Sequence, residues 1–273
     1  MLIKRLNGDV IDISNFNLKR LFHYIPSAEV NHTSASVEGR SDIITDTKLN
    51  NRIITVQFLY DSQDIVDYYL LRDELNALFL REEAFYIIFK KEPHKQYLVK
   101  TNSQFSIPPN PHMEAFEVEF ITLNTYGEFV FSTGELTSKE WDVDQFGWNG
   151  IIDWDSENLP QYTFTERNFT VLNLGNVAID PRQSYLRIEL RGIGPATSIT
   201  NNTTGDVYTF TDSLTSSDTL ILQGVQTFKN DISSFRNTNR RIITLAPGEN
   251  DFFVGGLSGG LQSISFDFRY LYK

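Results

Sequence analysis

The hydrophobic pattern between residues 52 and 128 changes period twice, and these changes predict a strand, then a helix, then further strands. Residues 52–60 are rich in β-branched and aromatic side chains, a composition that favours a strand. Runs at 84–89, 96–106 and 114–124 have the same character and predict an antiparallel meander. The last run alternates, with apolar residues on one face: Phe116, Val118 and Phe120. Its other face carries Glu117, Glu119 and Ile121.

The predicted helix lies between the first two of these strands. The pair Asp61-Ser62 is expected to cap it, because these side chains accept hydrogen bonds from the free amide groups of a first turn. Asp64 and Asp67 suit the positive end of the helix dipole. The apolar positions recur every three or four residues and form one stripe, which is expected to face the core: Tyr68, Leu71, Leu75 and Leu78.

The first fifty residues predict a hairpin, a strand and a long polar excursion. Apolar runs at 2–6 and 10–13 flank Asn7-Gly8-Asp9, and an Asn-Gly pair is a strong signal for a tight β-hairpin turn. Residues 17–25 favour another strand. From residue 27 to 51 the composition becomes polar and rich in Gly, Ser, Thr and Asp. This stretch is either a long mobile loop or a protruding hairpin, and excursions of this length are usually disordered or functional.

The second half of the chain predicts a separate all-β domain. We place the boundary after Gly134, which gives domains at 1–134 and 135–273. A segment rich in acids and tryptophan, 135–167, opens the second domain without a clear period. Short strands with turn residues between them then indicate a β-sandwich; they are expected at 169–174, 185–191, 198–201, 207–210, 219–222, 241–245 and 262–270. Turns are expected at Pro247–Asn250 and at the glycine-rich run 255–260.

Composition excludes several classes of protein. A chain of 273 residues has ample length for a buried core, and its net charge of −11 gives no attraction to the phosphates of nucleic acid. Cysteine is absent, which excludes disulfides and thiolate metal sites. The first residues lack the apolar stretch of a secretory signal, and no apolar run approaches the roughly 20 residues of a membrane helix. We therefore expect a protein made in a cytoplasm, without a membrane anchor or a sequence-reading nucleic-acid site.

No constellation for catalysis or a cofactor stands out. The histidines are scattered and none has a metal-binding spacing: His23, His32, His94 and His112. The run 255–260 lacks the lysine and the helix of a phosphate-binding loop, so we expect a flexible hairpin turn there. Asp142, Asp144, Gly147 and Asp153 partly mimic a calcium loop, but Phe146 occupies a ligand position and no flanking helices are predicted. We expect no catalytic, cofactor or metal-binding residues.

The tryptophans give the one candidate contact site. Trp141, Trp148 and Trp154 lie among acidic residues in the segment between the two domains. The favoured interpretation is a belt between domains, with indole rings packed on a neighbour and acids in water. Aromatic rings beside acids are also typical of sugar-binding clefts, and carboxylate pairs in such clefts can hydrolyse glycosides. The acidic candidates for that chemistry are Glu140, Asp153, Asp155 and Glu157.

The order of these elements resembles the distal tail proteins of phages with long, non-contractile tails. The resemblance rests on the strand that ends at Phe58-Leu59-Tyr60, the run Arg72–Phe79, the strand at Tyr97–Lys100 and the turn Leu123–Gly127. No one of these is diagnostic; their order and spacing carry the match. Leu245–Asn250, before a final aromatic strand, is similar to the family's C-terminal sandwich. The resemblance covers the whole chain and is better in the first half.

The resemblance implies a mainly β fold: an N-terminal ring-forming domain with one helix, and a C-terminal sandwich like a galectin or a carbohydrate-binding module. It implies a structural role, without enzymatic activity, at the virion tail tip after assembly in the host cytoplasm. The expected partners are further copies of the chain in a ring, usually a hexamer, the tail-tube protein, the tail-associated hub protein and receptor-binding proteins. DNA would pass through the ring. A carbohydrate-binding adhesin that contacts the host wall through Trp141, Trp148 and Trp154 is the alternative.

Overall fold

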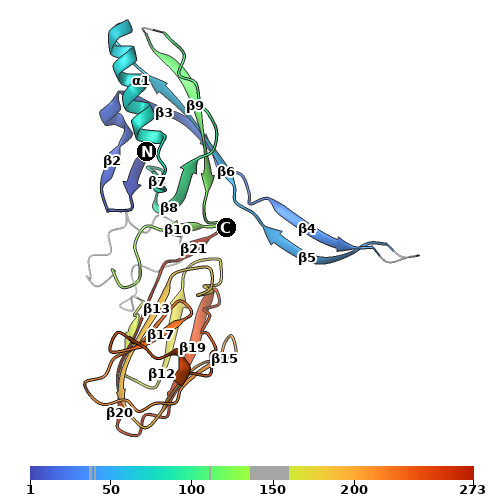
Figure 1. The fold of residues 1–273 in the computed structure, drawn as a ribbon, viewed down its shortest axis with the longest axis vertical. Coiled ribbons are helices and arrows are strands. Elements are labelled where there is room, and N and C mark those ends of the chain that lie inside the picture. The colour runs from blue at the N-terminus through green and yellow to red at the C-terminus, as the bar shows by residue number, and fades with distance from the viewer. Residues whose placement is uncertain (37–38, 40, 111, 136–159) are drawn as a thin grey trace. The chain divides into compact units, whose positions relative to one another are not determined.

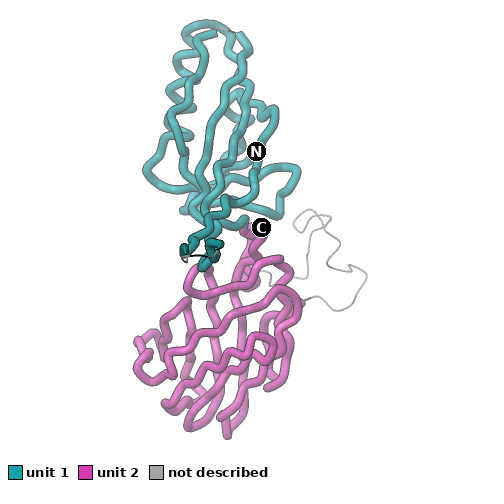
Figure 2. The backbone as a smooth tube through the Cα atoms, turned by 90° about the vertical axis from the view of Figure 1, so that its right-hand side faces the viewer, with its two compact units in different colours: residues 1–127, 273 teal, residues 128–272 magenta. Residues whose placement is uncertain are grey.

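The computed structural model describes residues 1–36, 39, 41–110, 112–135 and 160–273. They form two compact units, an N-terminal unit of residues 1–127 with residue 273, and a C-terminal unit of residues 128–272 (Figure 2). The sequence-based division after Gly134 lies inside the C-terminal unit. Residues 128–134 belong to the C-terminal unit because the amides of Phe129 and Thr133 donate hydrogen bonds to the carbonyls of Tyr270 and Phe268.

One antiparallel sheet forms the frame of the N-terminal unit, with the strand order β2-β1-β7-β8-β9-β6-β3 (Figure 1). The strands are β1 (Leu2–Arg5), β2 (Val10–Asp12), β3 (Leu18–Tyr24), β6 (Ile53–Tyr60), β7 (Phe85–Phe89), β8 (Glu92–Thr101) and β9 (Glu114–Thr122). The hairpin expected at the start of the chain is present, and Gly8 supplies the positive φ of its turn. The meander that follows the helix is also present.

Helix α1 (Ile65–Phe79) covers one face of this sheet. All four residues of the expected stripe are buried, and they share one core with Phe116, Val118 and Phe120 of β9. The expected cap at Asp61-Ser62 is wrong. Asp64 is the N-cap, because its Oδ1 accepts hydrogen bonds from the amides of Val66 and Asp67 at 2.8 Å each. A short 3₁₀ helix, η1 (Ile13–Phe16), joins β2 to β3.

The polar excursion after β3 is a hairpin of β4 (Val30–Ala35) and β5 (Ile43–Leu49). Figure 1 shows it as a separate ribbon of the N-terminal unit that continues into β6. Of the two expectations for this stretch, the protruding hairpin is the one that agrees with the structure. A register shift between Thr33 and Ser34 leaves Thr45 without an opposite residue.

The C-terminal unit is a sandwich of two antiparallel sheets, with strand orders β11-β20-β13-β16-β17-β18 and β12-β19-β14-β15. The strands are β11 (Thr163–Phe164), β12 (Asn168–Asn173), β13 (Leu186–Ile193), β14 (Thr197–Asn201), β15 (Asp206–Phe210), β16 (Leu220–Gln223), β17 (Gln226–Lys229), β18 (Ile232–Ser233), β19 (Gly248–Gly255) and β20 (Gly260–Phe268). Phe252 of one sheet and Phe266 of the other are 1–2% exposed, with ring centroids 4.9 Å apart. β10 (Gly127–Phe129) pairs with β21 (Leu271–Tyr272), and η2 (Phe235–Asn237) follows β18. The expected mainly β fold with a C-terminal sandwich is confirmed.

Three details of the sandwich differ from the sequence-based expectation. Residues 241–245 contain no strand, only an isolated bridge at Leu245. Pro247–Asn250 does not form a separate turn, because β19 starts at Gly248 and the amide of Asn250, 0% exposed, bonds backbone groups of Ala246 and Gly248. The run 255–260 closes no hairpin. It connects β19 in one sheet to β20 in the other, and Leu257 within it is buried.

Candidate assembly surfaces

The β4–β5 hairpin, called the arm from here, is exposed at every residue of both strands. A two-stranded ribbon without a packed face is at best marginally stable in water. Its large apolar side chains are nevertheless well exposed, at 49% for Val30, 52% for Ile43 and 59% for Ile44. The described residues of the N-terminal unit leave these side chains exposed, so their burial requires a further contact surface.

The two faces of the arm differ in charge. Directly opposed residues of antiparallel strands point to the same side, so the register assigns six residues to one face: Val30, His32, Ser34, Ile44, Thr47 and Leu49. This neutral face has no Asp, Glu, Lys or Arg, and His32 Nδ1 lies 2.9 Å from Thr47 Oγ1. The opposite face carries Asp46 and Lys48, which are 3.8 Å apart. The neutral face costs less to dehydrate and is the better contact surface.

Arg52 anchors the base of the arm. Arg52 is 6% exposed, and its guanidinium donates hydrogen bonds to the carbonyl of Thr125 from Nε (3.2 Å) and Nη2 (2.7 Å). Nη1 reaches the carbonyl of Pro26 at 3.5 Å, where the chain turns into the arm. The amide of Asn50 donates to the carbonyl of Glu29 across the base at 2.8 Å. The arm is thus exposed along its strands but fixed where it leaves the sheet.

A second exposed surface lies at the edge of the sheet. Strand β3 is the last in the order, and among the described strands it pairs only with β6, so its other side is an open edge of the sheet. Leu21, Phe22 and Tyr24 are 44%, 48% and 63% exposed, and the register shifts between Arg20 and Phe22. An apolar edge of this kind invites a further strand or an apolar partner surface.

A third surface is the outer side of α1. Ile65, Val66, Tyr69 and Leu70 are 44–63% exposed and follow the i, i+4 spacing of one helix face. The guanidinium of Arg72 lies 5.2 Å from the ring centroid of Tyr69. This side of the helix therefore presents apolar surface in addition to the stripe that α1 buries.

The sequence-based candidate contacts lie outside the described residues. Trp141, Trp148 and Trp154, together with the acids around them, belong to the stretch 136–159, so the sugar-binding and calcium interpretations stay predictions. The sequence did not predict the arm, the edge of β3 or the outer side of α1 as contact surfaces. An exposed neutral face is hard to recognise in a sequence, because it depends on strand register and on what covers each strand.

The histidines lie at separate places in the N-terminal unit. His23 stacks on Phe89 with a centroid distance of 3.9 Å, and burial together with Arg20 lowers its pKa. His32 lies on the arm, His94 is buried on β8, and His112 is exposed. Within the part of the chain that the structure describes, no three His, Cys, Asp or Glu residues are grouped so as to hold a metal ion. No helix in that part is long and apolar enough to span a membrane.

Part of the first unit matches a known protein family. Residues 11–122 match the family model described as the phage tail protein RIFT-related domain. This range contains η1, β3–β9 and the arm, and leaves out the sandwich. A comparison with curated protein sequences gives no match.

Among solved structures, the chain is similar over its whole length to Dit (gp 19.1) of SPP1, a paradigm of the hub adsorption apparatus of phages that infect Gram-positive bacteria. The TM-score is 0.68 at 11% identity, and the alignment covers 99% of each chain. Weaker similarity is found to a chain of the phage p2 baseplate in its activated conformation, with strontium (TM-score 0.46, 10% identity, 98% of this chain and 96% of that chain). At 11% identity the SPP1 Dit alignment establishes the fold.

Proposed function

We propose that this chain is a structural component of a phage tail tip. Its residues 11–122 match the phage tail protein RIFT-related domain, and its fold is similar to that of SPP1 Dit. Copies of the N-terminal unit close into a ring, expected to be a hexamer. The ring joins the last ring of the tail-tube protein to a tail-associated hub protein. The observation that carries this proposal is the arm. It is a two-stranded ribbon with apolar side chains, and both of its faces are exposed in the N-terminal unit.

The arm suits a heterologous contact. Identical copies form a closed ring when a projecting element of one copy binds a different surface of the next copy and the rotation closes. The N-terminal unit has such surfaces, the apolar edge of β3 and the outer side of α1. The neutral face of the arm can cover either without burying an unpaired charge, which would be costly. The arm therefore supplies one half of the interface between copies.

The sheet face that does not contact α1 suits the inside of the ring. Glu117 and Glu119 of β9 point away from the core shared with the helix, because side chains alternate along a strand. Lys19 and Lys100 lie on the same face, so the repulsion of DNA phosphates that would let DNA pass without adhering comes from the chain's net charge of −11 and not from this face alone. The C-terminal sandwich then serves as a platform that carries receptor-binding proteins.

The mass of the full chain in solution and electron microscopy of the same sample test this proposal. We expect ring-shaped particles, formed alone or on addition of the tail-tube or hub protein from the same phage. Ile44→Ser, on the neutral face, is expected to weaken assembly by at least about tenfold, since it removes an exposed apolar side chain that the proposed contact between copies would bury. Ile43→Ser is the matched control, because Ile43 is adjacent in sequence and similarly exposed but lies on the opposite face.

Two results would contradict the proposal. A strict monomer that binds neither the tube nor the hub protein excludes a ring component. Equal effects of Ile43→Ser and Ile44→Ser would show that the neutral face is not the contact surface, even if rings form.

A further inference from the structure

Helix α1 carries a second stripe of side chains, on the side opposite to the one that it buries. Its members are spaced alternately by four and three residues, so they share one side of the helix and form the outer stripe: Val66, Leu70, Asp73, Ala77 and Leu80. All of them are exposed. Tyr68 of the buried stripe is two residues from Val66, a rotation of about 200° around the helix axis. The helix therefore packs one side in its own unit and leaves the other side uncovered.

The outer stripe has a polar centre between two apolar ends. Val66 and Leu70 form the end near the start of α1, and Ala77 and Leu80 form the other end. Asp73 lies between them. Val66, Leu70 and Leu80 are 63%, 62% and 54% exposed. Contiguous apolar surface that is exposed to this degree marks an interaction site.

The neutral face of the arm has the same order of apolar and polar positions. His32 and Thr47 form its polar centre. Val30 and Leu49 lie opposite each other at the base, and Ile44 lies nearer the tip. Because residues of a strand are about 3.3 Å apart, each apolar end lies about 6–7 Å from the polar centre.

The lengths of the arm and the helix agree. The arm strands have 6 and 7 residues, which span about 20–23 Å at about 3.3 Å per residue. Helix α1 has 15 residues and spans about 22 Å at about 1.5 Å per residue. Along the helix axis, Leu70 lies about 4.5 Å and Ala77 about 6 Å from Asp73. The arm can thus lie along α1 with apolar ends against apolar ends and the polar centres together.

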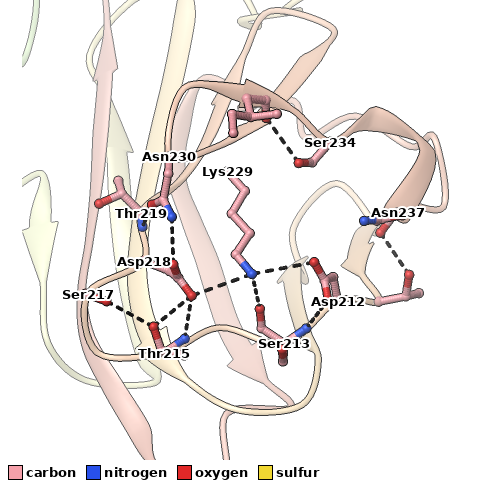
Figure 3. Close-up of polar contacts among 12 residues, drawn as sticks. Asp212, Ser213, Thr215, Ser217, Asp218, Thr219, Lys229, Asn230, Ser234 and Asn237 are labelled. Carbon is pink, nitrogen blue, oxygen red and sulfur yellow. Dashed lines mark hydrogen bonds and ion pairs between the residues drawn. The ribbon is translucent and has the colours of Figure 1, made fainter.

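The polar centre of the helix keeps a free acceptor. Arg72 donates from Nη2 and Nε to Asp73 Oδ1 at 2.9 and 3.1 Å, and no described residue bonds Asp73 Oδ2. Lys229 in the sandwich is the opposite case (Figure 3), because its Nζ lies 3.5 Å from Asp212 Oδ2 and 3.6 Å from Asp218 Oδ2. There the charge is paired twice within one copy, whereas Asp73 can accept a hydrogen bond from another molecule.

His32 supplies a donor for this acceptor. Its Nδ1 lies 2.9 Å from Thr47 Oγ1, and when the Thr47 hydroxyl donates this bond, the ring proton is on Nε2. The Nε2–H group is then free to donate to Asp73 Oδ2. A hydrogen bond to a carboxylate is stronger than one between neutral groups, so this contact would fix the register of the arm on the helix.

We propose that the neutral face of the arm of one copy lies along the outer stripe of α1 of the next copy. His32 bonds Asp73, and the apolar ends of the two surfaces pack on each other. The inference rests on the proposed ring and names the two surfaces that form it.

The difference between the two faces of the arm favours α1 over the edge of β3. A ribbon that adds to a sheet edge binds through the backbone of one strand, and both of its faces then have similar surroundings. Packing on a helix uses one face only, and the uncharged face costs least to bury. Strand β3 also carries Lys19 and Arg20 beside its exposed apolar residues, and the neutral face has no carboxylate to pair with them.

Cysteine pairs test this contact, because the chain has no cysteine of its own. The full chain with Ile44→Cys and Leu70→Cys, or with Ile44→Cys and Ala77→Cys, is assembled and oxidised. The products are then separated on a denaturing gel without reductant. The two pairs cover the two directions in which the arm can lie along the helix. We expect one of them to give covalent multimers, since a disulfide forms between cysteines whose Cβ atoms are about 4 Å apart.

Two matched controls accompany the cysteine pairs. Ile43→Cys replaces Ile44→Cys in each pair and is expected to stay monomeric on the gel, because Ile43 lies on the opposite face of the arm. Asp73→Ala is expected to weaken assembly by at least about fivefold, because it removes the acceptor for His32. Glu74→Ala makes the same charge change at the adjacent exposed residue, which lies off the outer stripe, and should leave assembly unchanged.

Several results would overturn the contact while the ring stands. They are rings without covalent multimers from either pair, equal multimers from the Ile43→Cys chains, or a disulfide within one copy. Multimers from Ile44→Cys with Phe22→Cys instead would place the arm at the edge of β3. Equal effects of Asp73→Ala and Glu74→Ala would remove the bond from His32. A chain that assembles neither alone nor with the tube or hub protein refutes the ring and this contact together.

Discussion

The arm and the β7–β8 hairpin are both antiparallel ribbons of the N-terminal unit, but their surroundings are opposite. β7–β8 lies in the middle of the sheet, with β1 on one side and β9 on the other, and Phe85, Ile87 and Phe89 are 0–1% exposed. Every residue of the arm strands is exposed. The β7–β8 hairpin is thus paired on both sides and packed in the core of the unit, whereas the arm is exposed.

This difference separates folding from assembly. The β7–β8 hairpin contributes to the stability of the unit, because its apolar face is removed from water when the unit folds. The arm contributes little to that stability, since its apolar side chains stay exposed to water when the unit folds. Substitutions in the two hairpins should therefore affect different measurements.

The largest effect is expected in the buried hairpin. Phe85 packs against Phe120 with a centroid distance of 6.0 Å, and the guanidinium of Arg5 lies 5.2 Å from its ring centroid. Phe85→Ala should lower the free energy of unfolding by about 3–5 kcal/mol, because it leaves a cavity in the core. Urea denaturation of the full chain at low concentration measures this. A decrease in the free energy of unfolding of less than about 1 kcal/mol would contradict the view that the β7–β8 hairpin stabilises the unit.

A smaller, pH-dependent effect is expected at the turn of the same hairpin. Lys90 Nζ lies 2.6 Å from Asp12 Oδ2. Burial alone would raise the pKa of Asp12, but hydrogen bonds from Lys90 and Ser14 lower it from 3.8 to about 2. The ionised carboxylate is thus favoured in the folded state, and its contribution is present above about pH 3.8 and lost as the pH falls towards 2.

The comparison of wild type with Asp12→Asn measures this contribution. The difference in unfolding free energy should be at most about 1 kcal/mol near neutral pH, because solvent screens a partly exposed ion pair. It should shrink as the pH falls from 4 to 2. A difference that grows on acidification would have the wrong sign for this explanation.

The smallest effect on stability is expected in the arm. Ile44→Ser should change the unfolding free energy of the monomer by no more than about 0.5 kcal/mol, because the side chain is already in water. Its effect should appear in assembly instead. A destabilisation comparable to that of Phe85→Ala would mean that the arm packs within its own unit and would remove the contrast between the two hairpins.

Local patterns predict most of the N-terminal unit. The stripe of Tyr68, Leu71, Leu75 and Leu78 and the alternation of β9 both depend on neighbouring residues, and both are present in the structure. The helix start was misplaced by a few residues, since several acidic residues there can cap and only the backbone decides that Asp64 does. Resemblance to distal tail proteins, which rested on the order of elements, agrees with the family model and with the fold of SPP1 Dit.

The sandwich and the candidate surfaces were harder to predict because they depend on tertiary contacts. β19 contains Asn250, a residue typical of turns, whose buried amide accepts a hydrogen bond from Asn201 Nδ2 of the neighbouring strand. Arg52 resembles any charged residue at a strand start, and its role at the base of the arm follows only from contacts with Thr125 and Pro26. Its distance from Thr125 in the sequence hides the pairing.

Arg52 also bears on the geometry of any ring that the arm helps to form. An arginine presents several donors in a fixed plane, so the hydrogen bonds at the arm's root resist rotation. The direction in which the ribbon leaves the sheet is then a constant of the monomer. In the proposed ring, this joint would contribute to the angle between successive copies, and with it to the number of copies in one turn.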